Sequence, residues 1–345
     1  MAAGQSLVFV SCADSGELHV LRLLEDGQLQ TAQVLALGGQ LMPMALSPSQ
    51  RQLYVARRSE PLAVISLAVD AAEGSVQVLG ESPLPASMAS LNTDRTGHWL
   101  FSASYGSDMV AVQSLDTQGH AAGTVVHPTG RHAHCVLADP TNRFVLATSL
   151  GADHLHRYHF DAATGQLQAM DAPVFPLPTG TGPRHLCFNE RGDRLYVLGE
   201  LDAHVHVLSF DAATGALATL QTLPTLPPGF EGKAWGADLH LTPDGRWLYS
   251  SERNSHTLAV HAVDLLSGQL SPAGHWPTQA TPRGFAITPD GRFLLAAGQT
   301  SHRVGVHAID GASGALTLIA EHSVGLNPNW VVVVPPSLHS RVPET

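Results

Sequence analysis

A short strand pattern recurs seven times along this chain, and its spacing restricts the fold more than any other feature. The seven copies read SLVFVS, RQLYVA, HWLFSA, RFVLAT, DRLYVL, RWLYSS and RFLLAA. Equivalent positions in successive copies lie 45, 47, 45, 50, 53 and 46 residues apart. A repeat of about 40–50 residues with strand signals and no helical periodicity is typical of a β-propeller with four-stranded blades. The sequence therefore predicts an all-β fold, a seven-bladed β-propeller of four-stranded blades.

The two ends of the chain indicate how the ring closes. The chain begins at what should be a second strand, VFVSC, and ends with an apolar run, NWVVVVPP, that has no strand partner of its own. Because an open strand edge promotes pairing with other chains, we expect Trp330 to Val334 to supply the inner strand of the N-terminal blade. We expect residues 1–345 to form a single propeller domain, with the patternless residues 337–345 as a loose tail.

Composition and charge narrow the class of partner. The formal net charge is −11 at pH 7, which disfavours nucleic acid and acidic membrane surfaces as partners. No segment reaches the roughly 18 consecutive apolar residues of a membrane-spanning helix, and the N-terminus lacks the basic region of a secretory signal. Cys12, Cys135 and Cys187 have no metal-binding spacing, so we expect reduced, buried thiols. These features predict a cytoplasmic protein and are compatible with a monomer.

Aligning the repeats selects the positions that should surround the central channel. The first set starts each inner strand: Met42, Ser87, His134, Arg184, Ala237, Arg283 and Asn329. The second set follows each second strand: Ala13, Arg58, Tyr105, Leu150, Glu200, Arg253 and Gln299. Charged and imidazole side chains concentrate on consecutive blades, at His134, Arg184, Glu200, Arg253 and Arg283. Such one-sided enrichment suits a pocket that binds an anion and performs acid–base chemistry.

These side chains also have purely structural interpretations. Arg184 follows a proline and could brace the backbone through neighbouring carbonyl groups, and Glu200 could simply neutralise a nearby arginine. The chain has 20 histidines, most of which should pack or face solvent. His132 and His134 share one face of a strand, as metal ligands can, but no third ligand has compatible spacing. We therefore expect no metal and no other cofactor.

Four segments resemble one known family. They are HAHCVLADPTNRFVLATSLGADHLHRY, GTGPRHLCFNERGDRLYVLGELD, ADLHLTPDGRWLYSSERNSHTLAVHAVD and PRGFAITPDGRFLLAAGQTSHRVGVHAIDGASGAL. This ordered set is similar to the seven-bladed propeller lactonases, which include 6-phosphogluconolactonases and carboxy-muconate cycloisomerases. The resemblance implies a catalytic site of His134, Arg184, Glu200 and Arg253. Two positions depart from the family pattern, because Gly199 and Glu252 stand where relatives often have asparagine.

The resemblance and the aligned positions together predict a metal-independent lactonase that hydrolyses an anionic, sugar-derived lactone, first of all 6-phosphogluconolactone. Arginines would bind the anion and the oxyanion, while His134 or Glu200 would activate water. We prefer His134 as the base, because an arginine pair would depress the pKa of Glu200. The expected substrate-binding residues are Arg283, His132, His185, Tyr105 and Gln299. The alternatives are an aldarolactone lactonase, a muconate-type cycloisomerase and a non-catalytic propeller scaffold.

Overall fold

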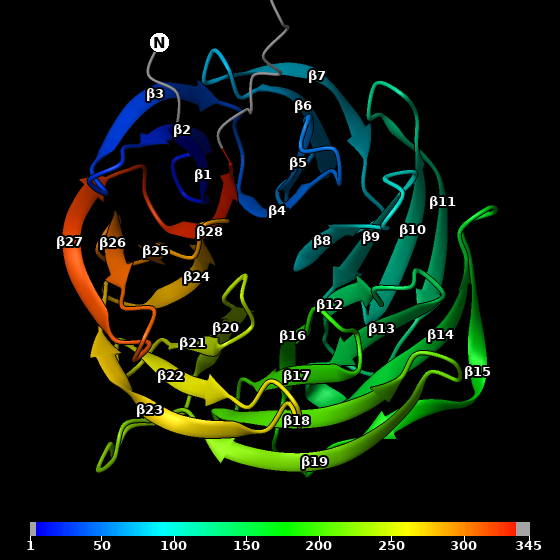
Figure 1. Ribbon diagram of the computed structural model, residues 1–345. Helices are drawn as coiled ribbons and strands as arrows, with labels where there is room; N and C mark the ends of the chain where they lie inside the picture. Colours follow the sequence, from blue (N-terminus) through cyan, green and yellow to red (C-terminus); the bar gives the residue numbers. More distant parts are fainter. Residues whose placement is uncertain (1–4, 336–345) are drawn as a thin grey trace, which may run out of the picture.

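Seven four-stranded antiparallel sheets form the computed structural model, which describes residues 5–335. The sheets are arranged as blades around a central axis (Figure 1). Apart from one turn of 3-10 helix, Leu150–Ala152, every regular element in this range is a strand. No helix in the described chain is long and apolar enough to cross a membrane. The prediction of an all-β, seven-bladed propeller is confirmed.

The blades are numbered here in chain order, starting from the blade that holds both ends of the described chain. Blade 1 consists of β28 (Pro328–Val334), β1 (Ser6–Cys12), β2 (Glu17–Leu23) and β3 (Leu29–Ala36). Blade 2 consists of β4 (Leu41–Leu46), β5 (Gln52–Arg57), β6 (Ala63–Asp70) and β7 (Ser75–Pro83). Blade 3 consists of β8 (Ser90–Thr93), β9 (Trp99–Ser104), β10 (Met109–Leu115) and β11 (Ala121–Pro128). Blade 4 consists of β12 (Ala133–Ala138), β13 (Phe144–Ser149), β14 (His154–Asp161) and β15 (Gln166–Pro176).

The remaining three blades repeat this order. Blade 5 consists of β16 (Pro183–Phe188), β17 (Arg194–Gly199), β18 (His204–Asp211) and β19 (Ala216–Pro224). Blade 6 consists of β20 (Gly236–Leu241), β21 (Trp247–Glu252), β22 (Thr257–Val263) and β23 (Leu270–Pro277). Blade 7 consists of β24 (Pro282–Ile287), β25 (Phe293–Gly298), β26 (Arg303–Ile309) and β27 (Leu316–Ser323).

Blade 1 combines strands from opposite ends of the chain. The C-terminal β28 pairs antiparallel with β1, in a register that places Trp330 opposite Ser11 and Val334 opposite Leu7. In Figure 1 the red β28 lies beside the blue β1. This pairing confirms the predicted closure of the ring and gives β1 a hydrogen-bonded partner on both sides. The loose tail expected at residues 337–345 lies outside the described residues.

Seven inner strands surround the axis. The position of a residue along its inner strand sets the height of its side chain, which means its position along the axis. The inner strands are β28, β4, β8, β12, β16, β20 and β24, and each contacts the inner strands of both neighbouring blades. The second strands are buried because each blade packs between two others. Val8 and Val10 of β1, for example, share a hydrophobic cluster with Leu295 and Ala297 of β25. This two-sided burial explains why the second strands read as the short apolar runs of the repeat.

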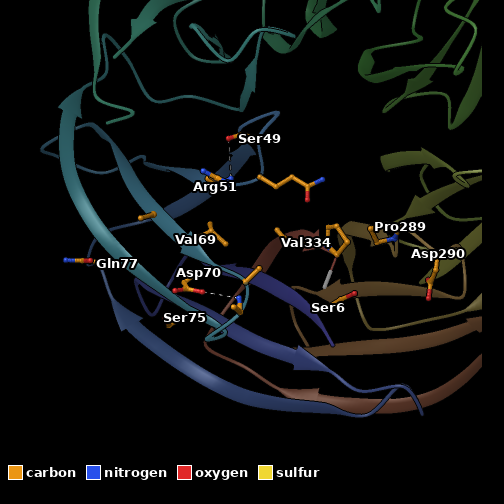
Figure 2. Close-up of a pocket in the computed structure, with 15 residues that line it drawn as sticks. Ser6, Ser49, Arg51, Val69, Asp70, Ser75, Gln77, Pro289, Asp290 and Val334 are labelled. Carbon is orange, nitrogen blue, oxygen red and sulfur yellow. Dashed lines mark hydrogen bonds between the residues drawn. The ribbon is translucent and has the colours of Figure 1, made fainter. Parts of the chain in front are cut away.

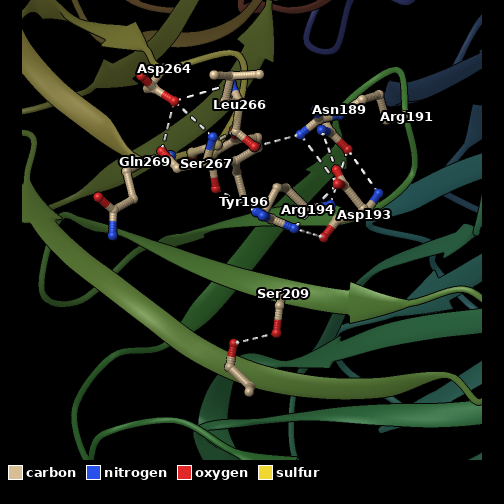
Figure 3. A network of polar contacts seen from close by, with 12 residues as sticks. Asn189, Arg191, Asp193, Arg194, Tyr196, Ser209, Asp264, Leu266, Ser267 and Gln269 are labelled. Atoms are coloured by element: carbon tan, nitrogen blue, oxygen red, sulfur yellow. Dashed lines mark hydrogen bonds and ion pairs between the residues drawn. The ribbon is translucent and has the colours of Figure 1, made fainter.

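One set of hydrogen bonds between neighbouring blades lies at the end of the ring opposite to the starts of the inner strands. Figure 3 shows this contact for blades 5 and 6. The hydroxyl of Tyr196 donates to the carbonyl of Gly268 at 2.9 Å. In the next pair of blades the hydroxyl of Tyr249 donates to the carbonyl of Gly314, also at 2.9 Å. Both tyrosines are fully buried, so these bonds satisfy groups that water does not reach and help to fix neighbouring blades.

The turn between β8 and β9 is built around one buried carboxylate. Asp94 accepts hydrogen bonds from the backbone amides of His98 at 2.9 Å and Trp99 at 3.0 Å. It also accepts from the side chains of Thr96 at 2.6 Å and Asn142, in blade 4, at 2.9 Å. Burial raises the pKa of Asp94, but the bonds from Thr96 and Asn142 outweigh it and hold the pKa below its usual value. The ionised carboxylate therefore stabilises the turn and joins two blades.

Asp94→Ala is expected to lower the free energy of unfolding by about 2–4 kcal/mol, because several buried donors lose their acceptor together. The native pKa lies below the unfolded value, so this stabilisation is present above about pH 4 and is lost as the pH falls through the native pKa. Urea unfolding at several pH values should show the difference from wild type shrinking below about pH 4. Asp26→Ala removes an exposed turn carboxylate and should cost less than about 0.5 kcal/mol. Equal losses in the two variants would contradict this assignment.

Candidate active site

The candidate residues of four consecutive blades meet at one end of the ring. His134 and Arg184 lie on β12 and β16, Arg283 lies on β24, and Glu200 and Arg253 directly follow β17 and β21. Glu200 Oε2 accepts a hydrogen bond from Arg184 Nε at 2.9 Å. The same oxygen lies 2.8 Å from Nη2 of Arg253. One carboxylate oxygen thus joins two guanidinium groups from different blades.

Arg184 and Arg253 also hold the backbone of blade 6. Arg184 Nη1 donates to the carbonyl of Ala237, at the start of β20. Arg253 Nη2 donates to the carbonyl of Gly236 at 2.7 Å, and its guanidinium carbon lies 4.0 Å from the centroid of the Trp235 ring. Burial, followed by Arg184, lowers the pKa of Arg253 to about 10, so this group is cationic at neutral pH. Arg184 thus braces the backbone in addition to pairing with a carboxylate.

Arg283 lacks the acceptors that the two other arginines have. Its Nε is buried and has no hydrogen-bond partner within residues 5–335. Burial, followed by Arg184, Arg253 and Arg58, lowers the pKa of its guanidinium, while Glu200 acts in the opposite direction. Three arginines therefore repel the buried guanidinium of Arg283, next to a single carboxylate. An anion that enters this group would relieve their repulsion.

Arg58 belongs to this group although it was only in an aligned position and not among the predicted site residues. It follows β5, and its Nε donates to the hydroxyl of Ser87 at 2.9 Å. Burial lowers the pKa of its guanidinium. The aligned repeats contain the signal that identifies it, because Arg58 is equivalent to Glu200 and Arg253.

His134 and Glu200 differ in their ability to accept a proton at neutral pH. Burial, followed by Arg184 and His185, lowers the pKa of His134 well below 6.5, so its imidazole is neutral at pH 7. Burial raises the pKa of Glu200, but Arg184 and Arg253 outweigh it and hold that pKa below its usual value. A lowered pKa weakens either group as a base, and both are unprotonated at pH 7. Glu200 is already held by two guanidinium groups, and the role of His134 as the proton acceptor stays a prediction.

Tyr105 and His132 form one side of the group. Their rings are stacked with centroids 4.1 Å apart, and the Tyr105 ring meets that of His134 edge to face at 6.4 Å. Burial, and then the negative charge of Glu200, raises the pKa of Tyr105. The phenol is therefore within electrostatic reach of that carboxylate. Contact of Tyr105 and His132 with substrate stays a prediction.

Gln299 and His185 make other contacts. Gln299 Nε2 donates to Asn327 Oδ1 at 2.7 Å, between blades 7 and 1. His185 is buried, and its Nδ1 lies 2.6 Å from Oδ1 of Asp238 on β20. These contacts occupy the amide of Gln299 and one ring nitrogen of His185. Their assignment as substrate-binding residues also stays a prediction.

Both departures from the family pattern have local explanations. A Cβ added at Gly199 would lie 2.0 Å from Oδ1 of Asp202, so the Asp202 side chain occupies the space that a larger residue would need. Glu252 is fully buried, and its two oxygens accept hydrogen bonds from the backbone amides of Trp235 and Ser255 at 2.5 Å each. The Glu252 carboxylate therefore supports the loop that carries Trp235.

A cavity of about 1060 Å³ lies away from the candidate residues. Its lining includes Ser6, Arg51, Asp70 and Asp290, from blades 1, 2 and 7 (Figure 2). Arg51 and Asp290 belong to turns between inner and second strands, at the opposite end of the ring from Glu200. Within residues 5–335, no three or more His, Cys, Asp or Glu side chains are grouped so that they could hold a metal ion.

Comparison with known proteins assigns this chain to a family. A family model described as lactonase, 7-bladed beta-propeller, matches residues 7–333. The chain belongs to this lactonase family. As a member, it is a lactone hydrolase. The resemblance seen in the sequence is thereby confirmed.

Relatives within the lactonase family match over almost the whole chain. A Pectobacterium carotovorum protein named 6-phosphogluconolactonase is 37% identical over 331 residues, which is 96% of this chain and 99% of its own. A Yersinia pseudotuberculosis protein of the same name is 36% identical over 327 residues, or 94% and 97% of the two chains. Among solved structures, the periplasmic gluconolactonase of Pseudomonas aeruginosa superposes with a TM-score of 0.89 at 30% identity. That match covers 96% of this chain and 100% of the other.

Proposed function

We propose that this lactonase hydrolyses 6-phosphogluconolactone, or a closely similar anionic sugar lactone, without a metal ion. The observation that carries the proposal is the positive charge of the site, in which Arg58, Arg184 and Arg253 repel the buried Arg283 close to Glu200. Two of them already share that carboxylate, and Nε of Arg283 has no acceptor in the described chain. Guanidinium groups bind phosphate through parallel, charge-assisted hydrogen bonds. Relatives named 6-phosphogluconolactonase support the same substrate.

In the proposed mechanism His134 activates the attacking water. Its Nε2 accepts a proton as the water oxygen bonds to the lactone carbonyl carbon, and Arg184 or Arg253 stabilises the negative charge on the carbonyl oxygen. The tetrahedral adduct collapses with cleavage of the ring C–O bond, and His134 returns the proton to the departing oxygen. The hydroxy acid product then ionises and releases one proton to solvent. Glu200 keeps the two guanidinium groups in position.

An unphosphorylated sugar lactone is the second candidate substrate. It is supported by the structural neighbour that is described as a gluconolactonase.

That neighbour is also described as periplasmic, whereas we propose a cytoplasmic location for this protein on the basis of its sequence. Cell fractionation with a periplasmic marker enzyme tests the location independently of the substrate.

Proton release in weakly buffered solution tests the function. The panel contains 6-phosphoglucono-δ-lactone, glucono-δ-lactone and a galactaro-lactone, each with and without a chelator. We expect kcat/KM for the phosphorylated lactone to exceed that for the neutral one by about 100-fold, with no effect of the chelator. A preference for the dicarboxylate lactone would instead support an aldarolactone lactonase. If the folded protein accelerates none of them, the proposed sugar-lactone substrates are overturned and cycloisomerisation of a muconate is the next assay.

A further inference from the structure

A carboxylate that the proposed mechanism does not use lies beneath the arginine group. Asp238 Oδ1 is 2.6 Å from Nδ1 of His185, and Oδ2 is 3.1 Å from Nε2 of His240. The carboxylate also accepts the backbone amides of Leu239 at 3.0 Å and Phe285 at 3.3 Å. Asp238 is 7% exposed, and burial raises its pKa, but His240 and His185 outweigh burial and hold that pKa well below the usual value. A charged acceptor is thus fixed on the inner strand next to that of His185.

The contact with Asp238 determines where His185 carries its proton. An ionised carboxylate can only accept, so Nδ1 of His185 must donate. Burial lowers the pKa of His185 to about 4, although Asp238 opposes the shift, so the ring is neutral at pH 7. A neutral imidazole with a proton on Nδ1 has a bare Nε2 that can only accept. This Nε2 is buried and has no partner in the described part of the chain.

His134 has the complementary requirement. Its ring centroid lies 5.1 Å from that of His185, with an angle of 52° between the planes. Nδ1 of His134 is likewise buried without a partner among residues 5–335. Nε2 of His134 is not one of the buried nitrogens that lack a partner. The other titratable groups that act on His134 or meet its ring are Arg184, Arg253, Arg283 and Tyr105. The three arginines are donors only, whereas Nε2 of His185, on the adjacent ring, is a buried acceptor without a partner among residues 5–335.

We propose that Nδ1–H of His134 donates to Nε2 of His185, so that Asp238, His185 and His134 form a hydrogen-bonded row. The row pairs two buried nitrogens that have no other partner in the described chain, and it leaves the lone pair of His134 on Nε2. Such contacts are often long in a protein without substrate and tighten when it binds. In the hydrolysis proposed above, on which this role rests, Nε2 takes the proton from water while Nδ1–H stays in place. His185 and Asp238 are therefore positioning residues, which set the tautomer of the base.

Two variants separate this row from general effects of the buried cluster. His185→Phe keeps an aromatic ring but removes the acceptor for His134, and it also removes a buried nitrogen without a partner. His240→Phe is the matched control, because it removes the other imidazole from the same carboxylate. We expect His185→Phe to lower kcat about 30-fold or more with KM changed less than about threefold. The control should stay within about threefold of wild type in both constants.

A spectroscopic readout tests the row without activity. Histidine ¹⁵N NMR spectra of the wild type at pH 7 should show His134 and His185 both protonated on Nδ1. In His185→Phe the His134 signal should move toward the Nε2–H tautomer, and in His240→Phe it should not. A wild-type His134 protonated on Nε2, or full kcat in His185→Phe, overturns the row. If the wild type hydrolyses no lactone, the proposed function fails, but the spectra still decide whether the row exists.

Discussion

Replacing Arg283 with methionine is expected to raise KM for 6-phosphoglucono-δ-lactone by about 100-fold and to raise the melting temperature. Bonds between a guanidinium and a phosphate are charge-assisted, and the loss of about 3 kcal/mol corresponds to this factor. The gain in stability has a different cause. Nε of Arg283 has no partner in the described chain, and the guanidinium is repelled by Arg58, Arg184 and Arg253. Methionine keeps much of the side-chain volume without the charge.

Steady-state kinetics with phosphorylated and neutral gluconolactone, together with thermal melts, measure both effects. The neutral lactone should lose much less affinity than the phosphorylated one. Arg303→Met is the matched control, because it removes an exposed arginine from β26 of the same blade, where Arg303 Nη1 lies 3.5 Å from Glu321. This control should leave KM unchanged. A lower melting temperature in Arg283→Met, with equal losses for both lactones, would show that Arg283 is a structural brace.

Replacing His134 with glutamine is expected to lower kcat by about 100- to 1000-fold, because general-base catalysis usually contributes a factor of this size. His322→Gln is the control, since His322 lies on the outer strand β27 and bonds to Thr31. It should keep wild-type kcat. Glu200→Gln distinguishes the two candidate bases. If Glu200 were the base, Glu200→Gln would lose the fall in kcat at low pH that protonation of the base causes. His134→Gln would then still show that fall.

The pH profile of the wild type gives a second test of His134. A base acts only when it is unprotonated, and the pKa of His134 is well below 6.5 because of burial and the positive charge of Arg184. Activity should therefore stay level as the pH falls through 6.5 and decline only near the native pKa. If the base were a histidine with the usual pKa, the enzyme would lose half its activity near pH 6.5. A decline centred there would contradict the assignment of a buried, neutral base.

The fold followed from the sequence because each blade buries its second strand on both faces. This burial requires a short apolar run at every repeat, so counting the runs predicted seven blades. The closing strand followed from a single unpaired run, Trp330 to Val334, which pairs with β1. The grouping of His134, Arg184, Glu200 and Arg253 followed from the same repeat. Equivalent positions in a ring of similar blades must lie at the same height around the axis.

The repeat does not predict which side chains contact one another at that height. The hydrogen-bond and ion-pair partners of a side chain depend on which residues the neighbouring blade places beside it. Asp238 is 53 residues from His185 in the chain, yet the two side chains meet between β16 and β20. Gln299 occupies an aligned position but bonds to Asn327, whereas Arg58 joins the arginine group. The sequence by itself thus determined the number of blades, the closure and the height of the site. Only the tertiary structure decided the ion pairs, the lack of a partner for Nε of Arg283 within residues 5–335, and the neutral state of His134, since burial and distances between blades set all three.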